Sequence, residues 1–146
     1  MPVARAKRRV DATPQVVWAL AADPYRLNAW WPGVERVENV GRSRWTTVLR
    51  SKRGRAVRAD YRLVSEDKGA RRREWEQELE GTPFARVFSL AVTEMHITSD
   101  GDGAKVALEE RTRLAGVNRT GGFMVRRARA KILREALDGL QDALAT

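Results

Sequence analysis

The chain has 146 residues, 42% of them hydrophobic, which is the size of one domain with one substantial core. It contains no cysteine, so disulfides, thiolate metal sites and cysteine nucleophiles are excluded. The longest uninterrupted apolar run, Val16–Ala22, is far shorter than the roughly 20 residues of a membrane-spanning helix. The basic N-terminal segment lacks the apolar stretch of a secretory signal, so we expect a cytoplasmic protein with a single domain over residues 1–146.

The 28 basic and 19 acidic residues give a formal net charge of +9, which attracts anionic partners at long range. Most of the cations are arginines spread along the chain, as a GC-rich genome would produce, so composition does not indicate a dedicated nucleic-acid partner. The densest basic stretch, between Arg42 and Arg62, has eight basic residues and only Asp60 as an acid. It supports an alternative function, a basic surface module that binds RNA or an anionic membrane.

The first predicted elements are a strand and two short helices. Polar and apolar residues alternate over Val3–Val10, as in a half-buried strand. Thr13-Pro14 is a helix start signal, an N-cap residue followed by proline, and "QVVWALAA" continues that helix. Asp23-Pro24 repeats the signal at once, so a second short helix over "YRLNAW" follows.

The rest of the chain is predicted to form strands and then one long helix. Alternating residues between glycine-containing turns predict six further strands. They are Val34–Val40, Trp45–Lys52, Val57–Val64, Arg72–Glu80, Arg86–Thr98 and Lys105–Leu114. Apolar residues at helical spacing predict a helix from about Gly122 to Leu144.

This order of elements predicts the fold class. Consecutive hairpins form an antiparallel sheet whose apolar face must be covered, and only the last helix is long enough to cover it. We therefore expect an α+β helix-grip fold. Its curved seven-stranded antiparallel sheet wraps around the C-terminal helix, the two short helices lie at one end, and a pocket lies between sheet and helix.

Three stretches match a known family: the opening "VDATPQVVWALAADPYRLNAWWPGVERVE", the strand "RREWEQELEGTPF" and the helix after "NRTGGFM". They resemble the START-like, or SRPBCC, superfamily, in particular its polyketide cyclase/dehydrase and coenzyme-Q-transport-like branch. The resemblance implies a START-like domain whose cavity holds a small hydrophobic, aromatic, polyketide-like or lipid-like ligand. Only some of these families are enzymes, so the resemblance predicts binding and leaves catalysis open.

The hairpin turns predict which side chains of the sheet point into the pocket. Strands Val57–Val64 and Arg72–Glu80 should pair around the turn "EDKGA". The predicted inward pairs are Tyr61 with Trp75, Ala59 with Gln77 and Val57 with Leu79, and the predicted outer ion pairs are Arg62 with Glu74 and Arg58 with Glu78. Tyr61, Trp75 and Gln77 are therefore expected to line the pocket.

The hairpin around "DGDG" predicts a carboxylate inside the pocket. The predicted pairs are Met95 with Leu108, Thr93 with Glu110 and Ala91 with Thr112, all inward. A carboxylate there must be paired, hydrated or protonated. The alternative is a slip of one residue, which would turn Glu110 outward and bring Glu109 or Arg111 inward.

The C-terminal helix carries one arginine on its apolar face. At 100° per residue, Arg129 projects among the apolar residues and the other basic residues project away from them. We expect Arg129 to neutralise Glu110 or to clamp an anionic group of the ligand. The alternative is that only its stem is buried and its head reaches past the edge of the sheet. Our sharpest prediction is that Arg129 and Glu110 meet in one cavity.

The adjacent Trp30 and Trp31 cannot share one face of a helix or strand. We expect one of them to pack with Trp18 in the core and the other to face the mouth of the pocket. There it would offer a flat apolar surface to an aromatic ligand, as Trp75 and Tyr61 would from the sheet.

Catalytic chemistry is restricted by what the sequence contains. His96 is the sole histidine and is expected on the outer face, which excludes histidine metal clusters and Ser-His-Asp triads, and we expect neither a metal nor a cofactor. In a cyclase or dehydratase, Glu110 or Tyr61 would move a proton beside a carbonyl. Arg129 or Gln77 would stabilise the enolate. A carrier would need only the cavity.

A third alternative concerns self-association. Phe88, Leu90 and Val92 fall on the expected outer face of their strand. Such an apolar stripe could be the contact of a homodimer.

Overall fold

The structure is a computed structural model that describes residues 2–51, 53–116 and 121–145. Its elements are β1 (Val3–Val10), α1 (Pro14–Ala21), the 3-10 helix η1 (Pro24–Ala29), β2 (Val34–Glu38), β3 (Arg44–Arg50), β4 (Ala56–Asp67), β5 (Arg72–Glu78), the 3-10 helix η2 (Pro83–Arg86), β6 (Phe88–Asp100), β7 (Gly103–Leu114) and α2 (Gly122–Leu144). The predicted order is confirmed, and η2 is an addition to it. Lys52, at the predicted end of the third strand, and residues 118–120 of the quoted "NRTGGFM" lie outside the described residues.

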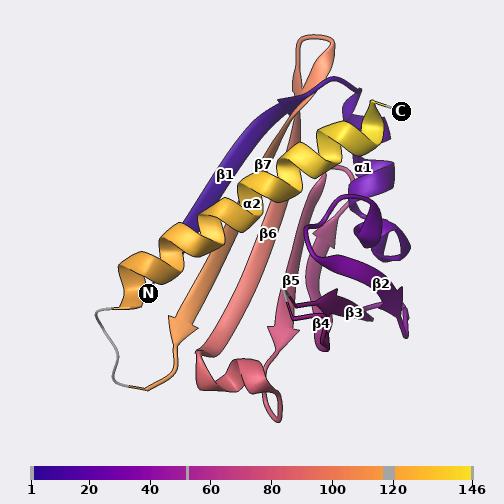
Figure 1. The fold of residues 1–146 in the computed structure, drawn as a ribbon. Coiled ribbons are helices and arrows are strands. Elements are labelled where there is room, and N and C mark those ends of the chain that lie inside the picture. The colour runs from indigo at the N-terminus through magenta and orange to yellow at the C-terminus, as the bar shows by residue number, and fades with distance from the viewer. Residues whose placement is uncertain (1, 52, 117–120, 146) are drawn as a thin grey trace.

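Both short helices begin at the predicted signals. The Thr13 hydroxyl oxygen accepts a hydrogen bond from the Val16 amide at 3.4 Å, and an Asp23 carboxylate oxygen accepts one from the Tyr25 amide at 3.0 Å. Each cap satisfies a backbone donor at the start of its helix that has no partner within the helix. The two helices lie beside one end of the sheet (Figure 1).

The seven strands form one antiparallel sheet in the order β1-β7-β6-β5-β4-β3-β2. The sheet curves, and α2 lies across its concave face (Figure 1), as predicted for the helix-grip fold. Sheet and helix share one core, in which Met95 and Leu108 from the sheet and Leu133 and Leu140 from α2 are almost completely buried. None of the described helices is both long enough and apolar enough to cross a bilayer.

The register of the β6–β7 hairpin is confirmed. Thr93 pairs with Glu110, and the neighbouring predicted pairs on either side are also observed. The reversal is tight because Asp100 and Gly103 are the last pair and Gly101 adopts a φ of 61°, which glycine reaches without strain. Glu110 is therefore on the inner face, and the alternative of a slip by one residue is wrong.

The predicted register of the β4–β5 hairpin is wrong by two residues. Tyr61 pairs with Gln77 rather than Trp75, and Leu63 pairs with Trp75. The turn lies closer to β5 than predicted, because an Asp67 carboxylate oxygen accepts from the Ala70 amide at 3.0 Å, and a bulge follows Leu63. A shift of two residues keeps every side chain on its face, so the predicted inward set is unchanged.

The outer face of the sheet is covered by ion pairs between strands, and this corrects the predicted charge pattern. Arg62 contacts Glu76 and Arg58 contacts Glu38, instead of the predicted Glu74 and Glu78. Arg44 and Arg50 are paired as well, with Glu78 and Glu35 respectively. Four of the eight basic residues between Arg42 and Arg62 are thus paired with glutamates of β2 and β5, which lie outside that stretch of sequence.

The predicted outer apolar stripe on β6 is also corrected. A bulge between Phe88 and Leu90 turns Phe88 to the inner side, where it packs with Leu79 and Ala91. Val92 is buried too, with 8% of its surface exposed. The three residues therefore do not form the exposed apolar stripe that was predicted as a homodimer contact.

Candidate functional site: a pocket between the sheet and α2

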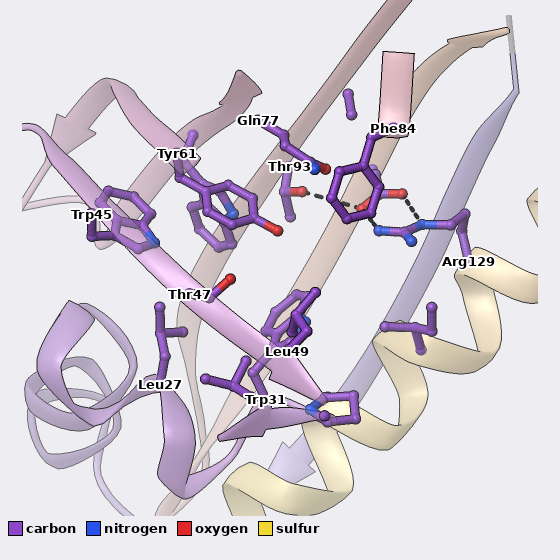
Figure 2. A pocket seen from close by; sticks show the side chains of 17 residues that line it. Leu27, Trp31, Trp45, Thr47, Leu49, Tyr61, Gln77, Phe84, Thr93 and Arg129 are labelled. Atoms are coloured by element: carbon purple, nitrogen blue, oxygen red, sulfur yellow. Dashed lines mark hydrogen bonds and ion pairs between the residues drawn. The ribbon is translucent and has the colours of Figure 1, made fainter. Parts of the chain in front are cut away.

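The sheet and α2 enclose a partly open pocket of about 260 Å³. Several of its lining residues are aromatic: Trp31 follows η1, Trp45 comes from β3 and Phe84 from η2 (Figure 2), and Trp75 comes from β5. Such flat, apolar side chains are typical of sites for small organic molecules.

The aromatic walls are held in place by one another. The Trp31 and Trp75 rings meet edge to face with centroids 6.3 Å apart. Trp45 stacks on Tyr61 with centroids 5.9 Å apart and planes 13° apart. Both arrangements are favoured by the charge distribution of aromatic rings.

The two adjacent tryptophans divide their roles as predicted. Trp30 is 4% exposed and belongs to the core, against which Trp18 also packs. Trp31 is half-buried and lines the pocket. The two rings are nearly perpendicular, with centroids 5.3 Å apart.

The polar centre of the pocket is an ion pair between Glu110 and Arg129. Arg129 Nε donates to Glu110 Oε1 at 2.5 Å and Arg129 Nη2 donates to Oε2 at 2.8 Å, a bidentate arrangement (Figure 2). Glu110 is 3% exposed and also accepts from the Thr93 hydroxyl at 3.4 Å. The predicted meeting of Arg129 and Glu110 is confirmed, and the alternative in which Arg129 reaches past the sheet edge is wrong.

The electrostatics of the pocket favour a charged pair beside a neutral phenol. Burial by itself lowers the pKa of Arg129, but the hydrogen bonds that Arg129 donates to Glu110 and the negative charge of Glu110 outweigh burial, so the pKa is raised. Burial is the main reason that the pKa of the Tyr61 phenol is raised, although the Arg129 charge acts in the opposite direction. Tyr61 therefore remains protonated at neutral pH, and its hydroxyl points into the pocket (Figure 2).

Most of the predicted site residues do gather around this pocket. Those that line it are Trp31, Tyr61, Trp75, Gln77, Thr93, Glu110 and Arg129. Trp30 does not line it. Sequence reasoning missed Trp45 and Thr47, although their alternation along β3 could have indicated them, and it missed Phe84 because η2 was not predicted.

A second inward arginine was also missed. Arg73 lies on the inner face of β5, hydrogen-bonds Glu66, and places its guanidinium 5.2 Å from the centroid of the Trp45 ring. Burial lowers the pKa of Arg73, while Glu66 acts in the opposite direction. Arg73 thus supports the face of Trp45 and, through the stacked rings, the Tyr61 wall of the pocket.

No three metal-ligating side chains come together within the described residues. His96 is half-buried on the outer face of the sheet, where it pairs across strands with Arg72 and Ala107. That position is where alternation placed it.

Comparison with known proteins identifies the family. The model of the "Polyketide cyclase / dehydrase and lipid transport" family matches residues 1–145. The chain belongs to this family. No match was found among curated proteins.

Several solved structures share the fold. The protein TTHA0849 from Thermus thermophilus is 24% identical, with a TM-score of 0.77 over 99% of this chain and 97% of its own. The di-domain ARO/CYC BexL of the BE-7585A biosynthetic pathway is 24% identical, with a TM-score of 0.84 over 99% of this chain and 47% of BexL. A START superfamily protein from Mycobacterium smegmatis is 12% identical, with a TM-score of 0.76 over 97% of this chain and 96% of its own.

Proposed function

We propose that this protein binds a small hydrophobic ligand, aromatic or polyketide-like or lipid-like, in the pocket between the sheet and α2. The observation that carries the proposal is a partly open pocket whose walls include Trp31, Trp45 and Trp75 and whose polar groups gather at Glu110 and Arg129. Membership in a family described by cyclase, dehydrase and lipid-transport functions supports the same class of ligand.

Carriage of the ligand is favoured over turnover. Three of the roughly four lone-pair sites of the Glu110 carboxylate already accept hydrogen bonds, two from Arg129 and one from Thr93, so little capacity is left to take a substrate proton as a general base. The pKa of the Tyr61 phenol is raised by burial, so the phenol is protonated at neutral pH and cannot act as a general base there. A cyclase or dehydratase remains the second candidate, since Tyr61, Gln77 and Arg129 line one pocket and could donate to the oxygen of an enolate.

Binding of RNA or of an anionic membrane is not favoured through the stretch between Arg42 and Arg62. Four of its arginines contact glutamates of other strands. Ions that are already paired release fewer counterions on binding phosphates, so these four arginines would add little affinity.

Calorimetric titration with 2-naphthol tests the pocket as the binding site. Leu49 is half-buried and lines the pocket, so Leu49→Trp should obstruct it and weaken binding at least tenfold. Val64→Trp adds a similar side chain at a position that is 43% exposed and is the matched control. Binding that survives Leu49→Trp, or that is lost equally in Val64→Trp, would contradict the proposal.

A further inference from the structure

The ion pair inside the pocket constrains the charge of the ligand, and this inference rests on the proposed function. We infer that the pocket selects an uncharged ligand, built on one or two fused aromatic rings, with a hydroxyl or carbonyl oxygen at its edge. An anionic ligand clamped by Arg129, which the sequence left open, is disfavoured by the same contact.

Glu110 and Arg129 neutralise each other inside the pocket. Glu110 is 3% exposed and engages Arg129 with both carboxylate oxygens, so the pair carries no net charge. A ligand carboxylate beside it would be a third buried charge with no partner of its own, and so would a ligand ammonium. Unpaired charges are strongly disfavoured where water is excluded. Among the residues that line the pocket, Glu110 and Arg129 are the charged ones, so no further ion is at hand to compensate.

Hydrogen bonding remains available to a neutral oxygen. A guanidinium has five N–H groups, and Glu110 uses one on Nε and one on Nη2 of Arg129. The Tyr61 hydroxyl points into the same space, and the Gln77 amide lines it (Figure 2). A hydroxyl or carbonyl oxygen can accept these bonds and adds no charge.

The volume of the cavity limits the size of the ligand. A cavity of roughly 150 Å³ lined by apolar side chains encloses benzene. The pocket here is about 260 Å³, which accommodates a second fused ring. Three or four fused rings would protrude or force Trp31 and Trp75 apart.

Charge selectivity can be measured on the unaltered protein with three probes that share the naphthalene ring system. At pH 7, 2-naphthol is neutral, 2-naphthoate is an anion and 2-naphthylmethylammonium is a cation. Calorimetry should show 2-naphthol binding at least tenfold more tightly than either ion. Equal or tighter binding of 2-naphthoate or of the ammonium would overturn the inference and leave the proposed function standing. If none of the three probes binds, the proposed function fails and the inference fails with it.

Two variants should reverse the selectivity in opposite directions. Glu110→Gln leaves Arg129 without a counter-ion, so 2-naphthoate should become the tightest of the three probes. Arg129→Met leaves Glu110 without one, so the ammonium should become the tightest. Circular dichroism checks that each variant folds, and the comparison on the unaltered protein decides the matter if either does not. Unchanged selectivity in a folded variant would overturn the inference.

The size limit has its own measurement. With four fused rings, 1-hydroxypyrene exposes more apolar surface than 2-naphthol and would bind more tightly to an open apolar surface. The pocket should instead bind it at least tenfold more weakly. Tighter binding of 1-hydroxypyrene would overturn the limit to one or two rings.

Discussion

Replacing Gly139 with alanine should destabilise the protein through a contact that also positions the pocket wall. Gly139 lies on α2 where the helix meets the loop after η1. A Cβ at this position would lie 2.3 Å from the Trp30 carbonyl oxygen and 3.2 Å from its carbonyl carbon. These are backbone atoms, which cannot rotate away, and the Trp30 and Trp31 amides are tied to the Leu27 carbonyl at 3.2 and 2.8 Å.

The expected magnitude is the difference between two opposing effects. Alanine is about 1 kcal/mol more favourable than glycine inside a helix. Overpacking typically costs about 1–3 kcal/mol, and a clash with anchored backbone falls at the upper end of that range. We therefore expect a net loss of about 2 kcal/mol in the free energy of unfolding and a fall in Tm of roughly 4–8 °C.

Urea denaturation followed by tryptophan fluorescence measures this loss. Gly122 is the control, because it lies on the same helix and a Cβ there would come no closer than 3.8 Å, to a Pro2 side-chain carbon. Gly122→Ala should leave stability unchanged or slightly raised. Because Trp31 follows Trp30, Gly139→Ala should also weaken 2-naphthol binding. A Gly139→Ala protein as stable as Gly122→Ala would show that α2 does not pack tightly against the Trp30 backbone.

Two further predictions concern the polar centre of the pocket. Arg129→Leu leaves the Glu110 carboxylate buried without a partner and should lower the free energy of unfolding, measured by urea denaturation at pH 8, by about 3–5 kcal/mol. The double variant Arg129→Leu with Glu110→Leu should regain most of this stability. A single variant as stable as the double variant would show that the pair is not buried. The ionisation of Tyr61 can be followed by absorbance, as the difference between the pH titrations of the wild type and of Tyr61→Phe. This difference should have its midpoint above pH 10.0, because burial raises the pKa of Tyr61. The folded state then keeps a proton that the unfolded state loses, so the stability from Tyr61 is complete below about pH 10 and is lost as pH rises through the raised pKa. A midpoint at or below 10.0 would contradict the burial of the hydroxyl.

The inner face of the sheet could be predicted because alternation has a period of two. The β6–β7 turn is short, so the pairing of Thr93 with Glu110 followed from the position of "DGDG". The β4–β5 turn is longer and a bulge follows Leu63, and neither feature has a strong signal in the sequence. The two-residue error left Tyr61 on the correct face, and for that reason the candidate site survived it.

Other features depend on contacts that sequence separation hides. The glutamate partners of Arg44 and Arg62 come from β5, so the stretch between Arg42 and Arg62 by itself shows the basic residues without these acidic partners. Phe84 reaches the pocket from η2, a single turn too short to give a periodic pattern. The inward turn of Phe88 depends on a bulge that one residue creates.

The most direct test of ligand binding between the sheet and α2 is a methyl NMR titration with 2-naphthol. The methyl groups of Leu27, Leu49 and Ile132 line the pocket, from three different parts of the chain. We expect saturable chemical-shift changes and nuclear Overhauser contacts to 2-naphthol at these three residues, with none at the exposed Val16 and Val64. Changes confined to exposed methyl groups, or no saturable change at the three pocket residues, would contradict binding in the pocket.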